Sequence, residues 1–179
     1  YRILGLACLR AHVDMGDESQ VVSKLLLLNI IFDGSRILLD GEDVADAIRE
    51  EAVSGAASRV SVHPKVRAAL LERQRAFQQA PGLVADGRDM ASVVFPQSVL
   101  KIYLTASAEA RAERRYKQLI GKGLAASITA LLQDIRLRDQ RDTERAAAPL
   151  VKCPGAVEVD TTRLTIAESV DSVLARYCS

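Results

Sequence analysis

Two clusters of charged residues in this 179-residue sequence bring carboxylates and arginines close together. In the first, Asp86-Gly87-Arg88-Asp89, the glycine permits a tight turn, so that two carboxylates flank one guanidinium. A carboxylate can hold Mg²⁺ or accept a proton, and an arginine can bind phosphate through two parallel hydrogen bonds. The cluster is therefore a candidate for phosphate chemistry. A solvated turn with internal ion pairs is the alternative.

The second cluster is expected on a helix that begins after Ser127 and is rich in arginine and aspartate. At about 100° per residue, Asp142 lies roughly 40° from Arg138 on the helical wheel, and Arg145 lies about 20° to the other side. These three side chains share one face, next to the apolar stripe, which predicts that they point into a cleft. The alternative is a solvated i,i+4 ion pair between Arg138 and Asp142.

A third group of basic residues precedes two glycines on the helix before that one: Arg111, Arg114, Arg115, Lys117, Gly121 and Gly123. Glycines beside a basic helix suggest a segment that can swing over anionic phosphates and exclude water, which predicts a helical lid. A surface helix that ends at a glycine cap is the other interpretation.

The composition excludes several classes of protein. Twenty-four basic residues against 23 acidic ones leave a net charge of +1, which argues against a protein that coats nucleic acid. No apolar run approaches the roughly 20 residues that a membrane span needs. Eighteen of the 24 basic residues are arginine. On composition alone, a GC-rich genome explains this excess better than phosphorylated ligands do.

Cysteine and histidine usage points to a reducing compartment and away from zinc. Three cysteines lie far apart and form no CxxC pair, which favours the cytoplasm. With only two histidines, no Cys/His zinc cluster can form at the usual spacings, and the ligands of any other metal are unknown. No long exposed apolar stripe demands a partner, so we expect a monomer.

The elements that must position these clusters alternate between helices and short buried strands. Apolar spacing and caps predict helices over 3–12, 21–29, 64–80, 107–121, 127–145 and 166–177, with Pro64 at the start of the third and Ser107 as the cap of the fourth. Strands are expected at 30–32, 37–39, 83–85, 99–104 and 157–159. This alternation predicts an α/β fold, a parallel sheet with flanking helices, while the hairpin around Asp33-Gly34 is a small antiparallel insert. Because ligands bind at the carboxyl ends of strands in such folds, we place Asp86-Gly87-Arg88-Asp89 at the centre of the site.

A phosphate-handling enzyme with this fold should carry a P-loop, GxxxxGK[ST], whose backbone N–H groups cradle the donor phosphates. The motif is absent from these 179 residues. The only Gly-Lys pair is Gly121-Lys122, which Gly123 follows, and Tyr116 stands where the first glycine should be. The sequence predicts that these residues alone cannot bind a nucleotide donor in the usual way.

Five stretches carry a resemblance that covers nearly the whole chain: LDGEDV at 39–44, RQRAF at 73–77, PGLVADGRDM at 81–90, VVFP at 93–96, and the run from Arg138-Asp139 to Ala148-Pro149-Leu150. They resemble the bacterial cytidylate kinases, P-loop nucleoside monophosphate kinases that transfer the γ-phosphoryl group of ATP to CMP or dCMP. The resemblance implies one kinase core over 1–179, with an inserted monophosphate-binding subdomain at 28–62 and a lid at 110–127. It also implies about 35–40 residues before the first, with a strand, the P-loop and a helix that activity requires.

The resemblance implies residues for the acceptor. Its α-phosphate would lie beside the Tyr1-Arg2 pair and among four arginines: Arg2, Arg88, Arg138 and Arg145. The cytosine edge would be read by Ser58, Arg67 and Asp89, since a carboxylate accepts from the exocyclic amine that uracil lacks. The ribose would contact Asp142 and Arg138.

The resemblance also implies the catalytic residues Asp86, Arg138 and Arg145, with Asp86 near Mg²⁺ and the transferring group. Arg114 and Arg115 would reach the ATP phosphates. Two rival hypotheses stay open. A catalytically silent CMP-binding fragment is favoured by the missing P-loop, and a kinase for another monophosphate, such as UMP, would show equal rates on UMP and CMP.

Overall fold

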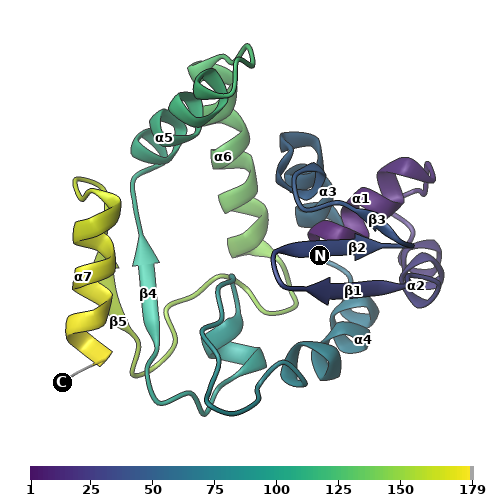
Figure 1. Ribbon diagram of the computed structural model, residues 1–179, viewed down its shortest axis with the longest axis horizontal. Coiled ribbons are helices and arrows are strands. Elements are labelled where there is room, and N and C mark those ends of the chain that lie inside the picture. Colours follow the sequence, from purple (N-terminus) through teal and green to yellow (C-terminus); the bar gives the residue numbers. More distant parts are fainter. Residues whose placement is uncertain (178–179) are drawn as a thin grey trace. The chain divides into compact units, whose positions relative to one another are not determined.

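The computed structural model describes residues 1–177, which form two compact units (Figure 1). Unit 1 contains Tyr1–Leu83 and Arg145–Ala147, and unit 2 contains Val84–Glu144 and the chain from Ala148 onward. Among the helices of residues 1–177, none combines the length and the apolar content that crossing a membrane requires.

Unit 1 is built mainly from helices, and contacts between neighbouring residues explain where two of them begin. They are α1 (Arg2–Arg10), α2 (Glu18–Leu26), the short 3-10 helix η1 (Ala47–Arg49), α3 (Glu51–Val60) and α4 (Pro64–Arg75). At the start of α2, the Asp17 carboxylate accepts hydrogen bonds from the backbone N–H groups of Ser19 and Gln20. Pro64 lies in the first turn of α4, where its missing N–H costs nothing. The predicted helices near 3–12, 21–29 and 64–80 are found as α1, α2 and α4, but α4 ends at Arg75 and not at residue 80.

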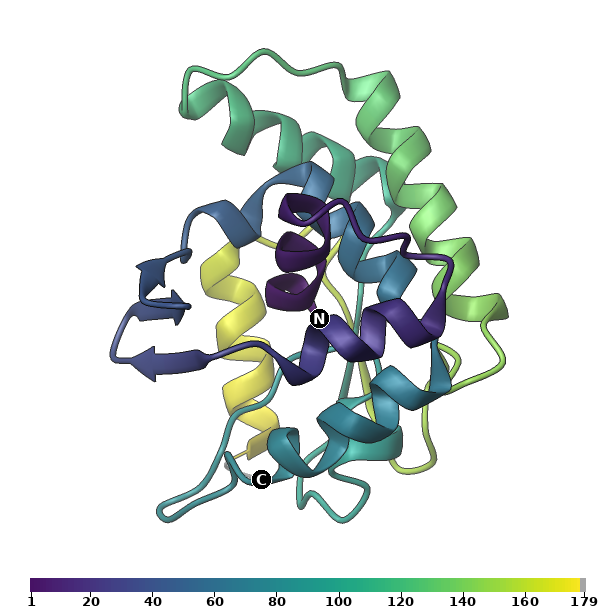
Figure 2. The same ribbon diagram turned by 90° about the vertical axis from the view of Figure 1, so that its right-hand side faces the viewer.

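The core of unit 1 forms where α1 packs against α3, and the two helices lie side by side in both views (Figures 1 and 2). Its most deeply buried side chains are Leu4, Cys8, Val21, Val44, Val53, Val60 and Val66. Gly5 permits the close approach, because a Cβ atom at this position would lie 2.8 Å from the backbone nitrogen of Ala57.

The antiparallel insert is a three-stranded sheet in the order β1-β2-β3. Its strands are β1 (Ile30–Asp33), β2 (Arg36–Leu39) and β3 (Glu42–Asp43). The register places Ile30 opposite Leu39, and Gly34 in the turn takes a φ of 57°. The predicted hairpin is confirmed. The third strand was not predicted, because two acidic residues show no strand periodicity.

Two contacts join the hairpin to the end of α4. The Phe32 and Phe77 rings meet edge to face with their centroids 5.3 Å apart, and the Arg73 guanidinium donates to the Ile30 carbonyl oxygen at 2.8 Å. The helix predicted over 64–80 would include Phe77, and that end of the prediction is wrong. Because α4 ends at Arg75, Phe77 lies beyond the helix, exposed, against the hairpin.

Unit 2 contains the predicted parallel pairing, between β4 (Ile102–Thr105) and β5 (Val157–Asp160). Its helices are α5 (Ala108–Gly121), α6 (Ile128–Glu144), α7 (Ile166–Tyr177) and a short π-type helix, η2 (Met90–Val94). The predicted cap of α5 is confirmed, since the Ser107 hydroxyl oxygen accepts from the Ala110 N–H at 3.1 Å. Figure 2 shows α5 and α6 as adjacent helices joined by a loop.

The strand expected at 83–85 is wrong. These residues belong to neither of the sheets found in residues 1–177, and the Val84 side chain is 99% exposed. An apolar run becomes a strand only where a neighbouring strand satisfies its backbone groups, and none does so here. The residues from Asp86 to Asp89 therefore lie in an irregular segment that leads into η2, not at a strand end.

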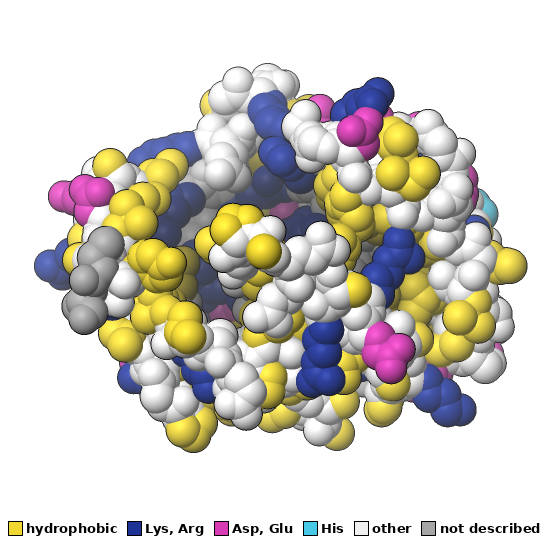
Figure 3. All heavy atoms as spheres, turned by 60° about the horizontal axis from the view of Figure 1, so that its bottom comes forward, with side chains coloured by type: hydrophobic (Ala, Val, Ile, Leu, Met, Phe, Trp, Pro, Cys, Tyr) yellow, Lys and Arg dark blue, Asp and Glu magenta, His cyan; other side chains and the backbone are white. Residues whose placement is uncertain are grey.

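The apolar side of α7 is exposed. No residue of α7 is buried, and its apolar side chains recur along one face at Ile166, Val170, Leu174 and Tyr177. Figure 3 shows apolar side chains gathered over this helix, on the left of the view. The expectation that the chain exposes no apolar stripe is therefore wrong. Sequence periodicity identifies an apolar face but does not say whether another element covers it.

Candidate active site

In unit 1, Ser61 joins three of the residues expected to bind the acceptor. The Arg67 guanidinium donates to the Ser61 carbonyl oxygen at 3.1 Å, and the Arg145 guanidinium donates to the Ser61 hydroxyl oxygen at 3.5 Å. That hydroxyl donates in turn to the Ser58 carbonyl oxygen at 3.0 Å. Ser61 itself was missed by sequence reasoning, since its only signal is a polar residue directly after α3.

The first two residues reach different parts of the same unit. The guanidinium carbon of Arg67 lies 5.7 Å from the centroid of the Tyr1 ring, a cation–π contact that adds Tyr1 to the group around Ser61. The Arg2 guanidinium instead donates to the Ile48 carbonyl oxygen at 2.9 Å and to the Ser54 hydroxyl at 2.7 Å. Arg2 is therefore held by η1 and α3.

Ser58 carries an unsatisfied hydroxyl. Its Oγ atom is buried and has no hydrogen-bond partner among the residues that the structure describes. A buried hydroxyl without a partner costs free energy, and a polar ligand group would remove that cost. The Ser58 hydroxyl could therefore bind a polar group of a ligand.

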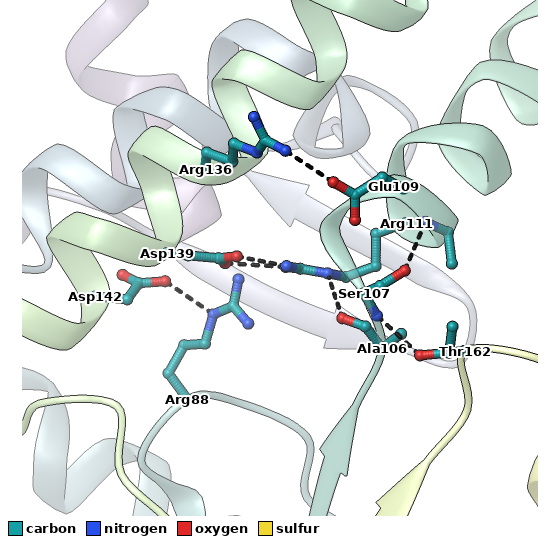
Figure 4. A network of polar contacts seen from close by, with 10 residues as sticks. Arg88, Ala106, Ser107, Glu109, Arg111, Arg136, Asp139, Asp142 and Thr162 are labelled. Carbon is teal, nitrogen blue, oxygen red and sulfur yellow. Dashed lines mark hydrogen bonds and ion pairs between the residues drawn. The ribbon is translucent and has the colours of Figure 1, made fainter.

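In unit 2, Arg88 and Asp142 form an ion pair. The Nε atom of Arg88 lies 2.9 Å from Oδ2 of Asp142, on a side chain of which only 7% is exposed. The two terminal nitrogens of Arg88 point away from Asp142 (Figure 4). The Nε edge of this guanidinium is therefore held by Asp142 on α6, and its two terminal nitrogens do not take part in that ion pair.

One turn earlier on α6, Asp139 accepts from both terminal nitrogens of Arg111 on α5, one of them at 2.9 Å (Figure 4). Burial alone would raise the pKa of Asp139. The hydrogen bonds and charge of Arg111, together with the charges of Arg88 and Arg138, outweigh burial and lower this pKa. The structure thus brings three arginines into electrostatic range of one carboxylate, and Arg138 is half-buried beside it.

The two remaining carboxylates of the first cluster differ in burial. Asp89 is 5% exposed and directly precedes η2, whereas Asp86 is exposed. The two environments suit different roles. A buried carboxylate can distinguish a ligand group that donates a hydrogen bond from one that does not, and an exposed carboxylate can bind a hydrated cation.

Arg114 lies at the carboxyl ends of the parallel strands. Its terminal nitrogens donate to the Thr161 hydroxyl at 3.2 Å, to the Thr161 carbonyl oxygen, and to the Leu164 carbonyl oxygen at 3.4 Å. Arg115, the next residue, is half-buried. Within residues 1–177, no three His, Cys, Asp or Glu side chains are grouped so that they could hold a metal ion.

The sequence is similar to a family of known activity. Residues 1–179 match the family model described as cytidylate kinase. A cytidylate kinase of Burkholderia mallei (strain NCTC 10229) is 54% identical over 177 residues, which cover 99% of this chain and 78% of that protein. A cytidylate kinase of Bordetella pertussis (strain Tohama I) is 51% identical over 179 residues, which cover all of this chain and 80% of that protein.

Proposed function

The chain belongs to the cytidylate kinase family, and we propose on that basis that it transfers the γ-phosphoryl group of ATP to CMP or dCMP. In this reaction an α-phosphate oxygen of the acceptor forms a bond to the γ-phosphorus. The bond from that phosphorus to the β–γ bridging oxygen breaks, and its electron pair leaves with ADP. Catalysis of this kind depends on positioning and charge neutralisation, which an arginine-rich site supplies.

The observation that carries the assignment of residues is the Arg88–Asp142 pair. With Nε held by the buried carboxylate and its terminal nitrogens turned away, Arg88 can present a fork to the acceptor's α-phosphate. Arg138 on the same helix would bind the phosphate and, with Asp142, the ribose. Arg2 and Arg145 would complete the neutralisation of the acceptor phosphate.

Selection of cytosine is proposed to fall to Asp89, with Ser58 and Arg67. Asp89 is 5% exposed, so solvent is poorly placed to compensate a mismatched ligand. Its carboxylate can accept from the exocyclic amine of cytosine, whereas uracil offers an oxygen at that position and two acceptors would face each other. We therefore expect CMP to be a better substrate than UMP.

The donor side is proposed to involve Asp86, Arg114 and Arg115. Mg²⁺ commonly binds one or two carboxylates, the nucleotide phosphates and water, and the exposed carboxylate of Asp86 suits that donor set. When bound, Mg²⁺ would neutralise charge on the transferring group. Arg114 would exchange its hydrogen bonds to Thr161 for bonds to the ATP phosphates, while 110–127 acts as the lid and 28–62 as the monophosphate-binding subdomain.

We propose that the protein works as a cytoplasmic monomer. Cys8 and Cys153 are both free, as expected for a reducing compartment, and Cys8 is buried. Size-exclusion chromatography with light scattering tests the monomer, and a dimer that disperses when Leu174→Glu is introduced would assign the exposed face of α7 to self-association instead.

A coupled assay with ATP and either CMP or UMP tests the proposed function, on purified full-length protein whose intact mass has been measured. We expect transfer to CMP at a kcat/KM at least about tenfold above that for UMP. Equal values for the two acceptors would overturn the role of Asp89. Binding of CMP without any transfer would favour the alternative, a silent CMP-binding module.

A further inference from the structure

We propose that Arg111 is a positioning residue, which sets the orientation of α6 through Asp139 and so places Arg138 and Asp142 for the acceptor. The inference rests on the proposed function only for the identity of that acceptor. Neither the family match nor the sequence motifs assign this task to Arg111, which sequence reasoning grouped with the lid.

All three nitrogens of the Arg111 guanidinium bind the protein (Figure 4). Both terminal nitrogens donate to the Asp139 carboxylate, and Nε donates to the Ala106 carbonyl oxygen at 3.2 Å. Ala106 directly follows β4. One rigid, planar side chain thus ties a turn of α6 to the end of a strand, and a planar fork fixes direction as well as distance.

The residues that depend on this tie lie within one helical turn of it. Arg138 precedes Asp139, and Asp142 follows it by three residues, on the same side of the helix. Asp142 holds Arg88 at 2.9 Å. A helix moves as a unit, so a rotation of α6 about its axis would displace Arg138 and Asp142 together, and Arg88 with them.

A second ion pair joins the same two helices and offers a matched control. The Arg136 guanidinium donates to the Glu109 carboxylate at 2.8 Å through a single nitrogen, and both side chains are 62% exposed. In the Arg111–Asp139 pair, by contrast, both side chains are 32% exposed and the contact is bidentate. Exposed single contacts contribute little to structure, so only the more buried pair is expected to fix α6.

The test compares Arg111→Ala, Arg111→Lys and Arg136→Ala in steady-state assays with CMP and with dCMP. A misplacement of about 1 Å can cost on the order of a hundredfold in rate, so we expect Arg111→Ala to lower kcat/KM for CMP by about ten- to a hundredfold. Because Asp142 is proposed to contact the ribose, the ratio of kcat/KM for CMP to that for dCMP should also change. Arg136→Ala should leave both quantities within about twofold of the wild type.

Two further variants keep the result interpretable. Arg111→Lys retains the charge but not the fork, so it should fold like the wild type and still shift the CMP/dCMP ratio. The double variant Arg111→Ala/Asp139→Ala leaves no lone charge and should recover thermal stability without recovering kcat/KM. If the folded Arg111 variants keep a wild-type ratio and lose activity only in proportion to their unfolded fraction, Arg111 is merely structural and the inference is overturned.

The outcome can be separated from a failure of the proposed function. Wild-type protein that transfers no phosphate to CMP, or Arg138→Ala with wild-type kinetics, would contradict the proposed site itself. An active wild type that loses activity in Arg138→Ala but not in Arg111→Ala or Arg111→Lys would contradict only the positioning role.

Discussion

The Arg88–Asp142 pair makes an asymmetric prediction about stability. Arg88 has 41% of its side chain exposed and Asp142 only 7%, so each partner is left in a different environment when the other is removed. Arg88→Ala removes the positive charge paired with a buried carboxylate, and breaking a buried ion pair in this way costs about 3–5 kcal/mol in general. Solvent around the half-exposed arginine screens part of this, so we expect a loss of about 1–2 kcal/mol in the free energy of unfolding.

Asp142→Asn should cost less than about 1 kcal/mol, because it leaves no buried charge behind and the guanidinium of Arg88, with 41% of its side chain exposed, can be hydrated. The two substitutions should also compensate each other. In the Arg88→Ala background the buried charge that has lost Arg88 is the source of the cost, so Arg88→Ala/Asp142→Asn should be more stable than Arg88→Ala alone.

Urea denaturation at pH 7 without nucleotide, monitored by far-UV circular dichroism, measures the free energy of unfolding of four proteins: the wild type, the two single variants and the double variant. The free energies of unfolding can be compared only if the dependence of this free energy on urea concentration, the m-value, agrees among the four proteins. If the double variant is no more stable than Arg88→Ala, the charge of Asp142 is not what the arginine compensates. The picture of Arg88 as a side chain held on one edge by a buried carboxylate would then be refuted.

Two further predictions concern the scaffold. Gly5→Ala should destabilise the protein by about 1–3 kcal/mol, because its Cβ would lie 2.8 Å from a backbone nitrogen of α3, while Gly55→Ala, which meets nothing within 4 Å, should stabilise α3 by up to about 1 kcal/mol. Thermal unfolding compares the two, and equal effects would contradict the α1–α3 contact. The hydrogen bonds from Ser19 and Gln20 lower the pKa of the Asp17 cap to about 2. Its contribution should therefore be complete above about pH 4 and disappear as the pH falls through 2, so Asp17→Asn should lose less stability than the wild type over that range.

Features governed by neighbouring residues could be predicted from the sequence. Pro64 starts α4, Ser107 caps α5, and the Asp33-Gly34 pair lies where β1 turns into β2, each through contacts that span only a few residues. Local sequence propensity gave a wrong prediction where strand formation depends on a neighbouring strand. The run at 83–85 has the composition of a buried strand but no strand beside it, and Val84 is 99% exposed.

The candidate site shows the same division. Helical spacing predicted that Arg138 and Asp142 share a face, and both lie on α6. It also placed Arg145 on that face, which is wrong, because α6 ends at Glu144. No spacing rule could reveal that Arg111 binds Asp139, 28 positions further along, or that Arg145 reaches Ser61, 84 positions away. Ser61 was missed for this reason, and Arg111 was grouped with a lid because its partner lies on another helix.

Counting donors separates arginines that composition could not distinguish. A guanidinium carries five N–H groups in a fixed plane, so an arginine bound to the protein along one edge can still present another to phosphate. Arg88 is held through Nε and directs its terminal nitrogens elsewhere, which suits a ligand-binding side chain. Arg111 has committed Nε and both terminal nitrogens to the protein, which suits a positioning side chain. Arg88 and Arg111 are thus suited to two different physical tasks within unit 2, and the loss of either arginine should leave a different kinetic signature.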